Sequence, residues 1–301
     1  MKVLVIGGGI SDEREVSLRS ANAIFEGAKS AGHEVEFYDW DGSKDWLNKN
    51  IQDFDVCLPI LHGKGGEDGQ IQSILEKSGS HFLGSSSDVS RVCFDKRLVL
   101  DTLKRNQIMI PEGVLVNHDQ YKKHKLINRP HILKPNKGGS SLGVVFVRDP
   151  SHIDSTMVDR VFSEWREMLL EEIIEGTEIT VPVLDGLQMP IIKIIPPEAG
   201  EFDYENKYNG ATKEIVNPEE IDQKLKDESQ KLGKKIHNLL KCRHLSRTDM
   251  ILTAEGELYV LEVNTMPGMT NQSLFPKAAG IAGLSFDQLA DYFIKLAAGK
   301  L

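Results

Sequence analysis

The feature that most constrains the fold is an alternation of apolar, strand-like runs with helical segments in the first third of the chain. Residues 2–6, 34–38 and 54–61 have strand character, while residues 15–30 and 68–78 have helical periodicity and are closed by Gly32 and Gly79. Such alternation predicts a parallel sheet with helices on its faces. Ligands of such sheets bind at the carboxyl ends of the strands, so we expect functional residues in the loops at 7–15 and 62–69.

The two loops differ in what they indicate. Residues 7–15 begin with three glycines, but Asp12 stands where a dinucleotide-binding fingerprint needs its third glycine, which disfavours a nicotinamide cofactor. Residues 62–69 contain four glycines and several charges, more than a simple connection needs. His62 at the start of this loop has two open interpretations, a structural histidine or a functional one.

Oxygen-bearing side chains gather near the C-terminus. Glu262 and Asn264 lie two residues apart at the end of an apolar strand and therefore point to the same face. The turn at residues 255–257 predicts a hairpin, which places Asp249 of the preceding strand beside them, with Arg247 nearby. Hard oxygen ligands of this kind suit Mg²⁺. Taken alone, the acidic pair has a simpler explanation as the end of an edge strand.

A second anion-binding pattern occupies residues 131–145. A strand ending in Lys134 is followed by a loop of small residues and then by a second strand. Its glycines allow backbone N–H groups to converge on an anion, and Ser140 and Ser141 add hydroxyl donors. Because a strand follows, this is no Walker loop, and we interpret it as a flap over phosphates. Lys96, on a helix expected at residues 88–105, taken alone is better explained as solvated charge.

Further strands are predicted at residues 168–172, 178–184 and 188–195, and helices at 218–240, from 273 onward and at 286–298. The stretch between residues 196 and 217 has no clear period but contains Phe202, Tyr204, Lys207 and Tyr208. Loops of this length inside compact domains are typical of functional lids, and the aromatic residues argue against simple disorder.

Composition excludes several classes of protein. The 301 residues, 40% apolar and 27% charged, are typical of a soluble globular protein of two or three domains. The net charge of −9 argues against nucleic-acid binding. The three cysteines form no paired motif, which disfavours disulfides and zinc and favours reducing surroundings. No run approaches the ~18 apolar residues of a membrane span, so we expect a cytoplasmic protein without a membrane contact.

In order and spacing, the motifs resemble those of the D-alanine–D-alanine ligases of the ATP-grasp superfamily, and the resemblance extends over essentially the whole chain. It is carried by residues 11–17, 62–69, 95–96, 134–135 with 139–141, 207–208, 247–249, 262–270 and 273–274. Residues 82–87 are less similar, Val92-Cys93-Phe94 is bulkier than the small residues expected there, and Leu142 replaces a common valine.

The resemblance implies an α/β ATP-grasp fold with an N-terminal Rossmann-like parallel-sheet domain. The expected divisions are an N-terminal substrate domain at 1–86, a central ATP-grasp subdomain at 87–171 and a C-terminal subdomain with lid and metal site at 172–301. ATP is expected between the two antiparallel sheets of the latter two. The implied activity joins two D-alanine molecules through a D-alanyl phosphate for peptidoglycan precursor synthesis, and the implied assembly is a homodimer.

The resemblance also assigns roles to individual residues. Two Mg²⁺ or Mn²⁺ ions would be held by Asp249, Glu262 and Asn264. ATP would be bound by Lys96, Lys134, Ser140, Ser141, Glu171, Glu172, Ile174, Glu178 and Lys207. The first D-alanine would contact Glu13 and His62, and the carboxylate of the second would contact Ser273 and Leu274. Arg247 and the N–H of Gly268 would stabilise an oxyanion, and the catalytic set is completed by a hydrogen-bonded triad of Glu13, Ser140 and Tyr208.

Three other functions compete with this one. A relative that makes D-alanyl-D-lactate or another mixed product is the nearest alternative, and the Lys207-Tyr208 pair counts against it. A nicotinamide-dependent oxidoreductase is disfavoured by Asp12 in the glycine loop and by the predicted metal hairpin. A nucleotide-sensing or structural module without catalysis is disfavoured because the full set of polar residues is present.

Overall fold

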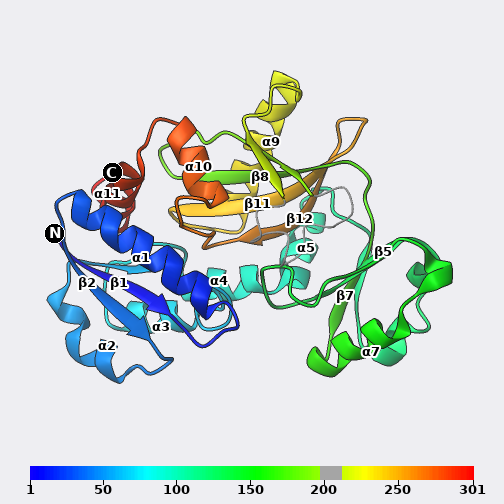
Figure 1. Ribbon diagram of the computed structural model, residues 1–301, viewed down its shortest axis with the longest axis horizontal. Coiled ribbons are helices and arrows are strands. Elements are labelled where there is room, and N and C mark those ends of the chain that lie inside the picture. The colour runs from blue at the N-terminus through cyan, green and yellow to red at the C-terminus, as the bar shows by residue number, and fades with distance from the viewer. Residues whose placement is uncertain (197–211) are drawn as a thin grey trace.

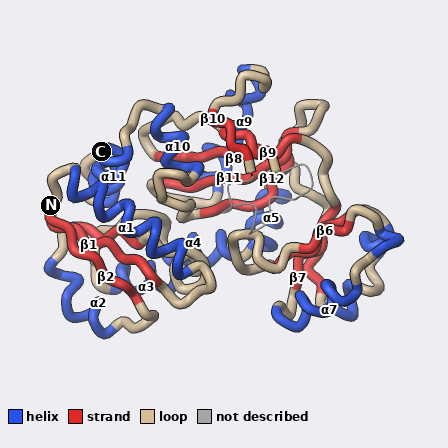
Figure 2. Tube along the Cα trace, viewed as in Figure 1, coloured by secondary structure: helices blue, strands red, loops and turns tan. Residues whose placement is uncertain are grey.

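The computed structural model describes residues 1–196 and 212–301. Its strands form three sheets, which follow one another along the long axis of the molecule (Figure 1). Figure 2 shows the same arrangement by secondary structure, with helices packed against each group of strands. The site described below depends on how these sheets meet.

The first sheet is parallel, as the alternating pattern predicts. Its order is β2 (Glu34–Trp40), β1 (Lys2–Gly8) and β3 (Val56–Pro59), so the expected strand at 54–61 is shorter than predicted. The central strand β1 is buried from Val3 onward, as expected where helices cover both faces. One face packs against α1 (Arg14–Ser30), and the other against α2 (Asp45–Asn50) and α3 (Gln70–Lys77).

The prediction of a single helix at residues 88–105 is wrong, because the chain forms two helices there. These are α4 (Ser87–Phe94) and α5 (Lys96–Arg105), separated by Asp95 in an extended conformation. The Asp95 carboxylate caps α5 by accepting a hydrogen bond from the N–H of Leu98, and it also accepts one from Asn136 Nδ2 at 2.9 Å. This contact with a distant loop favours the break and brings Lys96 to the start of α5.

The second sheet is antiparallel and has the order β4-β7-β5-β6. The apolar faces of its strands share a core with α7 (Ser155–Glu164) and with Tyr121 of the short helix α6 (His118–Tyr121). The strands are β4 (Gly113–Val116), β5 (His131–Pro135), β6 (Val145–Val147) and β7 (Met168–Glu172). Single 3-10 turns lie at Ile51–Asp53, Lys125–Asn128 and Pro150–His152.

The third sheet, also antiparallel, has the order β10-β9-β8-β11-β12. Helix α9 (Gln223–Leu239) packs against β8 and β11. The hairpin predicted around residues 255–257 is confirmed, since β11 and β12 pair antiparallel on either side of that turn. The strands are β8 (Thr177–Leu184), β9 (Ile192–Ile195), β10 (Lys213–Val216), β11 (Leu245–Leu252) and β12 (Leu258–Asn264).

The last two helices bring the chain back to the first sheet (Figure 1). Helix α10 (Leu274–Ile281) packs against β10, whereas α11 (Phe286–Ala297) packs against α1 and β3. The approach of α11 to α1 is close: a Cβ atom on Gly27 would lie 3.1 Å from the Phe286 ring and 3.2 Å from Ala290 Cβ. One apolar core therefore joins the two ends of the chain.

Within the described ranges, no helix combines the length and the apolar character needed to cross a membrane.

Candidate functional site

Two adjoining cavities form the candidate site. The first, the inter-sheet cavity of about 400 Å³, lies between the second and third sheets. The second, the inner cavity of about 690 Å³, is bounded by the loops of the first sheet, the hairpin β11–β12 and the start of α10. Both are lined by Lys96, Gly138, Gly139 and Glu262. A molecule bound in one cavity can therefore reach a molecule bound in the other across this shared wall.

The inter-sheet cavity is lined by several residues that were predicted to bind ATP. Its lining includes Lys134 with Glu171, Glu172, Ile174 and Glu178, from the end of β7 to the start of β8. The Nζ atom of Lys134 lies 2.6 Å from Oε2 of the buried Glu171. The other oxygen, Oε1, has no hydrogen-bond partner among the described residues. Since an unpaired buried acceptor is costly, this atom marks a place where a ligand donor fits.

The small-residue loop after β5 is held in an uncommon backbone conformation. Ser140 and Ser141 have φ values of 51° and 56°, in the left-handed region that residues other than glycine rarely adopt. Such local strain is found mainly at functional sites, where the surrounding structure fixes it. Ser141 lines the inter-sheet cavity and Ser140 the inner one, so the loop separates the two as a flap.

The predicted metal ligands meet on the hairpin. Asp249 and Glu262 are direct partners in the register of β11 and β12, and Asn264 pairs with Arg247. Arg247 donates two hydrogen bonds to the carboxylate of Asp249, at 2.9 Å and 2.7 Å. Burial alone would lower the pKa of Arg247, but attraction by Asp249 outweighs it and raises this pKa above its usual range. The guanidinium therefore stays charged at the junction of the cavities.

Lys96 connects this hairpin with the flap. Its Nζ atom donates to the carbonyl oxygen of Gly138 at 2.6 Å and lies 3.5 Å from Oε2 of Glu262. A cation in this position can contact the phosphate groups of a nucleotide that extends from the inter-sheet cavity toward the inner one. The sequence pattern favoured a solvated role for Lys96 because it placed the residue inside one continuous helix rather than at the start of α5.

The donor set on the hairpin fits Mg²⁺. Asp249 and Glu262 line the inter-sheet cavity, and Asn264 lines the inner one. In the described part of the chain, no group of three or more His, Cys, Asp or Glu side chains is arranged for a metal. Two carboxylates and an amide oxygen are nevertheless what Mg²⁺ needs when substrate phosphates and water supply the rest of its coordination.

The inner cavity is organised around Glu13, which is 6% exposed. The hydroxyl of Ser140 donates a hydrogen bond to Oε1 of Glu13, which ties the flap to the first sheet. Two glycines make room for the carboxylate: a Cβ atom would lie 2.7 Å from Glu13 Oε2 at Gly63 and 3.0 Å from it at Gly139. The third member of the predicted triad, Tyr208, lies outside the described residues, as does Lys207.

His62 lines the inner cavity, but its ring is engaged by the protein. Nδ1 lies 3.1 Å from the carbonyl oxygen of Met266 and Nε2 lies 3.1 Å from Ser20 Oγ, which also accepts a hydrogen bond from the N–H of Met269. Burial lowers the pKa of His62 to about 4, so the ring is neutral. The expected contact with a substrate carboxylate stays a prediction. Through Met266, His62 is also tied to the loop that carries Gly268.

The residues predicted for the second substrate subsite lie where this loop meets α10. A Cβ atom on Gly268 would lie 3.0 Å from Ser273 Oγ, so these two residues are in close contact. Ser273 Oγ accepts a hydrogen bond from the N–H of Thr270 rather than capping α10. Gly268, Ser273, Leu274 and Arg247 all line the inner cavity, as the sequence-based assignment requires.

Several lining residues of the inner cavity were not predicted. Glu67 accepts a hydrogen bond from the N–H of Gly63 at 2.6 Å. Burial, followed by repulsion from Glu13, raises the pKa of Glu67 to about 8. The charged, glycine-rich loop was a visible signal for this residue. No local pattern identifies Arg19, Glu214 or Lys277, which also line the cavity.

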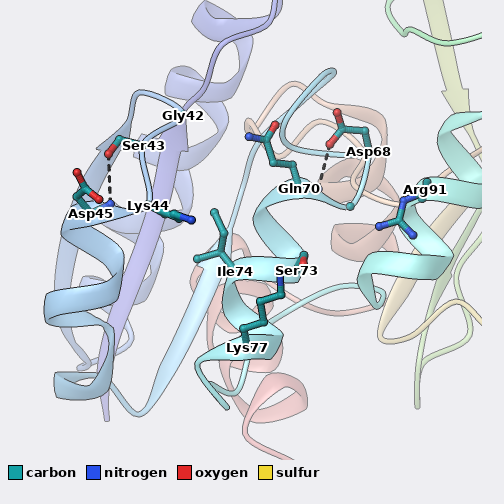
Figure 3. Close-up of a pocket in the computed structure, with 11 residues that line it drawn as sticks. Gly42, Ser43, Lys44, Asp45, Asp68, Gln70, Ser73, Ile74, Lys77 and Arg91 are labelled. Carbon is teal, nitrogen blue, oxygen red and sulfur yellow. Dashed lines mark hydrogen bonds between the residues drawn. The ribbon is translucent and has the colours of Figure 1, made fainter.

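A third hollow, of about 700 Å³, lies between the loop that follows β2 and helix α3 (Figure 3). Figure 3 shows Lys44 and Asp45 on one side of it, with Ile74 and Lys77 of α3 on the other. Among the described residues it shares no lining side chain with the two cavities. It is therefore not part of the candidate site.

Comparison with known proteins gives one consistent family. The family model for the D-ala D-ala ligase C-terminus matches residues 106–295. A D-alanine–D-alanine ligase of Maridesulfovibrio salexigens is 39% identical over 100% of this chain and 99% of its own, and one of Clostridium beijerinckii is 37% identical over 98% of both. The crystal structure of the Bacillus anthracis ligase complexed with ATP is 34% identical, covers 99% of this chain and 97% of its own, and has a TM-score of 0.83. The predicted fold class is confirmed by this likeness.

Proposed function

The chain belongs to the D-alanine–D-alanine ligase family, and from this premise we propose that it joins two D-alanine molecules with conversion of ATP into ADP and phosphate. The product, D-alanyl-D-alanine, would serve peptidoglycan precursor synthesis. The observation that carries the proposal is the shared wall of the two cavities, formed by Lys96, Gly138, Gly139 and Glu262. It allows a phosphoryl group to pass from a nucleotide to an amino acid.

In the first step, a carboxylate oxygen of the first D-alanine attacks the γ-phosphorus, and the bond to the β-phosphate breaks to release ADP. Glu13 binds the ammonium group of this D-alanine, and its hydrogen bond from Ser140 keeps the flap over the reacting groups. Lys96 neutralises phosphate charge from the shared wall. Positioning and charge neutralisation are the main means by which proteins catalyse such transfers.

In the second step, the amine of the second D-alanine, having lost a proton, attacks the acyl carbon, and phosphate leaves as the peptide bond forms. The negative oxygen of the tetrahedral intermediate needs donors that are already in place. Arg247 and the N–H of Gly268 fill this role, the first held by Asp249 and the second by the loop that His62 fixes. Ser273 and Leu274 bind the carboxylate of the second D-alanine.

The proposal includes Mg²⁺, or Mn²⁺ in its place, held by Asp249, Glu262 and Asn264. When bound, such ions neutralise phosphate charge and polarise the transferred group. The other nucleotide-binding residues are proposed from the family resemblance: Lys134, Ser140, Ser141, Glu171, Glu172, Ile174, Glu178 and Lys207, with Tyr208 as the third member of the triad.

The remaining parts of the proposal concern the whole protein. We propose the domain division at residues 1–86, 87–171 and 172–301, a homodimeric assembly and a cytoplasmic location. The absence of a membrane-spanning helix in the described ranges and the acidic net charge are compatible with a soluble protein that binds small molecules. Size measurement in solution by light scattering tests the assembly.

The activity is tested by ADP release with ATP and Mg²⁺ across D-alanine, L-alanine, D-serine and D-lactate, with product identification by mass spectrometry. We expect release that requires D-alanine and yields D-alanyl-D-alanine. Equal turnover with L-alanine would contradict the proposal. Preferential formation of D-alanyl-D-lactate would favour the alternative of a mixed-product ligase. The Glu13→Gln variant tests the contact with the ammonium group, because it keeps the size of the side chain and removes its charge.

A further inference from the structure

An ion pair outside the predicted set forms part of the wall of the inner cavity. Nζ of Lys277 on α10 lies 2.7 Å from Oε2 of Glu214 on β10, and both side chains line the cavity. Their side chains are 33% and 17% exposed, so the pair is reachable from the cavity. Neither residue was assigned a role from the sequence.

Lys277 lies directly behind the subsite proposed for the second D-alanine. It is one helical turn after Ser273, and its N–H donates to the Ser273 carbonyl oxygen at 3.1 Å. Residues four apart in a helix share a face, and both side chains line the same cavity. The ammonium group therefore belongs to the same wall as Ser273 and Leu274, which would receive the carboxylate.

Fold stability gives little reason for this pair. Apolar contacts already hold α10 in place, since Leu274, Phe275 and Ala278 belong to a core against which Val216 of β10 also packs. Partly exposed ion pairs between flexible side chains add little to stability. The charges are therefore better explained by what they do in the cavity.

The chemistry of the pair suits an amino-acid zwitterion. An ammonium group offers three N–H donors, and its hydrogen bond to Glu214 uses one. Lys277 can thus donate to an incoming carboxylate while Glu214 restrains its flexible stem. Glu13 and Glu67 also line the cavity and disfavour a carboxylate beside them, whereas the ammonium group on α10 favours one.

We propose that Lys277 is a specificity-determining residue that recognises the carboxylate of the second D-alanine, and that Glu214 is the positioning residue that aligns it. This inference rests on the proposed function. It goes beyond that function by assigning acceptor selection to a charge on α10. An acceptor without a free carboxylate should accordingly be rejected.

The test uses D-alaninamide as a competing acceptor. This compound has an amine but no carboxylate, so it can only occupy the second site. With D-alanine, D-alaninamide, ATP and Mg²⁺ present, the measurement is the ratio of D-alanyl-D-alaninamide to D-alanyl-D-alanine by mass spectrometry. We expect the parent to favour D-alanine, and Lys277→Gln to raise the ratio by about 10- to 100-fold, the range for losing a hydrogen bond between charged groups.

Kinetic constants separate acceptor recognition from general damage. In Lys277→Gln, the KM for the second D-alanine should rise while the KM for ATP stays unchanged, and Lys277→Arg should restore much of the parent behaviour. Lys295→Gln is the matched control, because it removes a lysine from an ion pair with Asp291 on α11, outside the cavity. It should leave the ratio and both KM values unchanged.

A charge exchange distinguishes recognition from a structural ion pair. Glu214→Lys combined with Lys277→Glu keeps the pair but reverses its orientation. If the pair only supports the fold, this double variant should behave like the parent, which would overturn the inference. If Lys277 recognises the carboxylate, the raised ratio should remain. A parent that forms no dipeptide at all would contradict the proposed function itself, whereas dipeptide formation with an unchanged ratio in Lys277→Gln would contradict only this inference.

Discussion

His62 makes a pH-dependent contribution to the stability of this protein, and the size of that contribution follows from the surroundings of the ring. Burial lowers its pKa from 6.5 to about 4 in the folded state. Between these values the unfolded chain binds a proton at His62 that the folded chain excludes, so the contribution of His62 to the free energy of unfolding falls as the pH falls from about 6.5 toward 4. A difference of about 2.5 pKa units at ~1.36 kcal/mol each corresponds to about 3 kcal/mol.

Replacing His62 with Gln removes this titration. Urea unfolding is measured for parent and variant from about pH 7 to about pH 4.5. The variant is less stable at neutral pH, because it loses the contacts with Met266 and Ser20, but the difference in stability between parent and variant should shrink as the pH falls from about 6.5 to about 4.5. His81→Gln is the matched control, since His81 is exposed, and it should keep the parent's slope. Equal slopes for parent and His62→Gln, or an NMR titration of His62 with a midpoint near its ordinary value, would refute the reasoning.

Three further predictions concern other residues. Glu262→Gln removes a charge at the shared wall, so the rate of dipeptide synthesis should fall by at least ~10²-fold. The melting temperature should not change. Near-parent activity with normal Mg²⁺ dependence would mean that the metal lies elsewhere. Gly69→Ala places a Cβ atom 2.3 Å from the Ser87 carbonyl oxygen at a φ of +89°. Gly79→Ala places one at a φ of +72° with no atom within 4 Å, so Gly69→Ala should lower the free energy of unfolding more than Gly79→Ala does. Equal losses would argue against the clash. The pKa of Glu67 is raised from 4.5 to about 8, so the folded state holds an extra proton between these values and the contribution of Glu67 to stability is lost as the pH rises through them. The stability of the parent relative to Glu67→Gln, measured by urea unfolding, should therefore fall as the pH rises, and a constant difference between the two proteins would contradict this.

Local patterns predicted the parts of the fold that depend on local chemistry. The parallel order of β1, β2 and β3 follows from strand and helix alternation, and the hairpin β11–β12 follows from its turn. The break between α4 and α5 did not follow from the pattern. It depends on Asp95 reaching Asn136, which is 41 residues away, and no periodicity within the helix records such a contact.

The residues of the candidate site likewise fall into those that local patterns predict and those that depend on long-range packing. Asp249, Glu262 and Asn264 were predictable because two strands with a short turn fix their register. Lys277 and Glu214 were not, since their cavity wall forms only when α10 packs against β10. For His62 the position at a strand end was informative, but its neutral state depends on burial by residues from other parts of the chain, and its ring contacts Ser20 and Met266 are equally distant in sequence. Burial and long-range partners therefore decide roles that sequence position leaves open.

The packing of α11 on α1 has a consequence for how the protein is made. The ribosome releases α1 long before α11, yet the face around Gly27 receives Phe286 and Ala290 only when α11 has emerged. At roughly 5–20 residues per second, this leaves an apolar surface uncovered for a period on the order of tens of seconds. Nascent chains should therefore depend on chaperones until residues 286–297 have been synthesised. Deletion of α11 should damage the first sheet as severely as a mutation within its core.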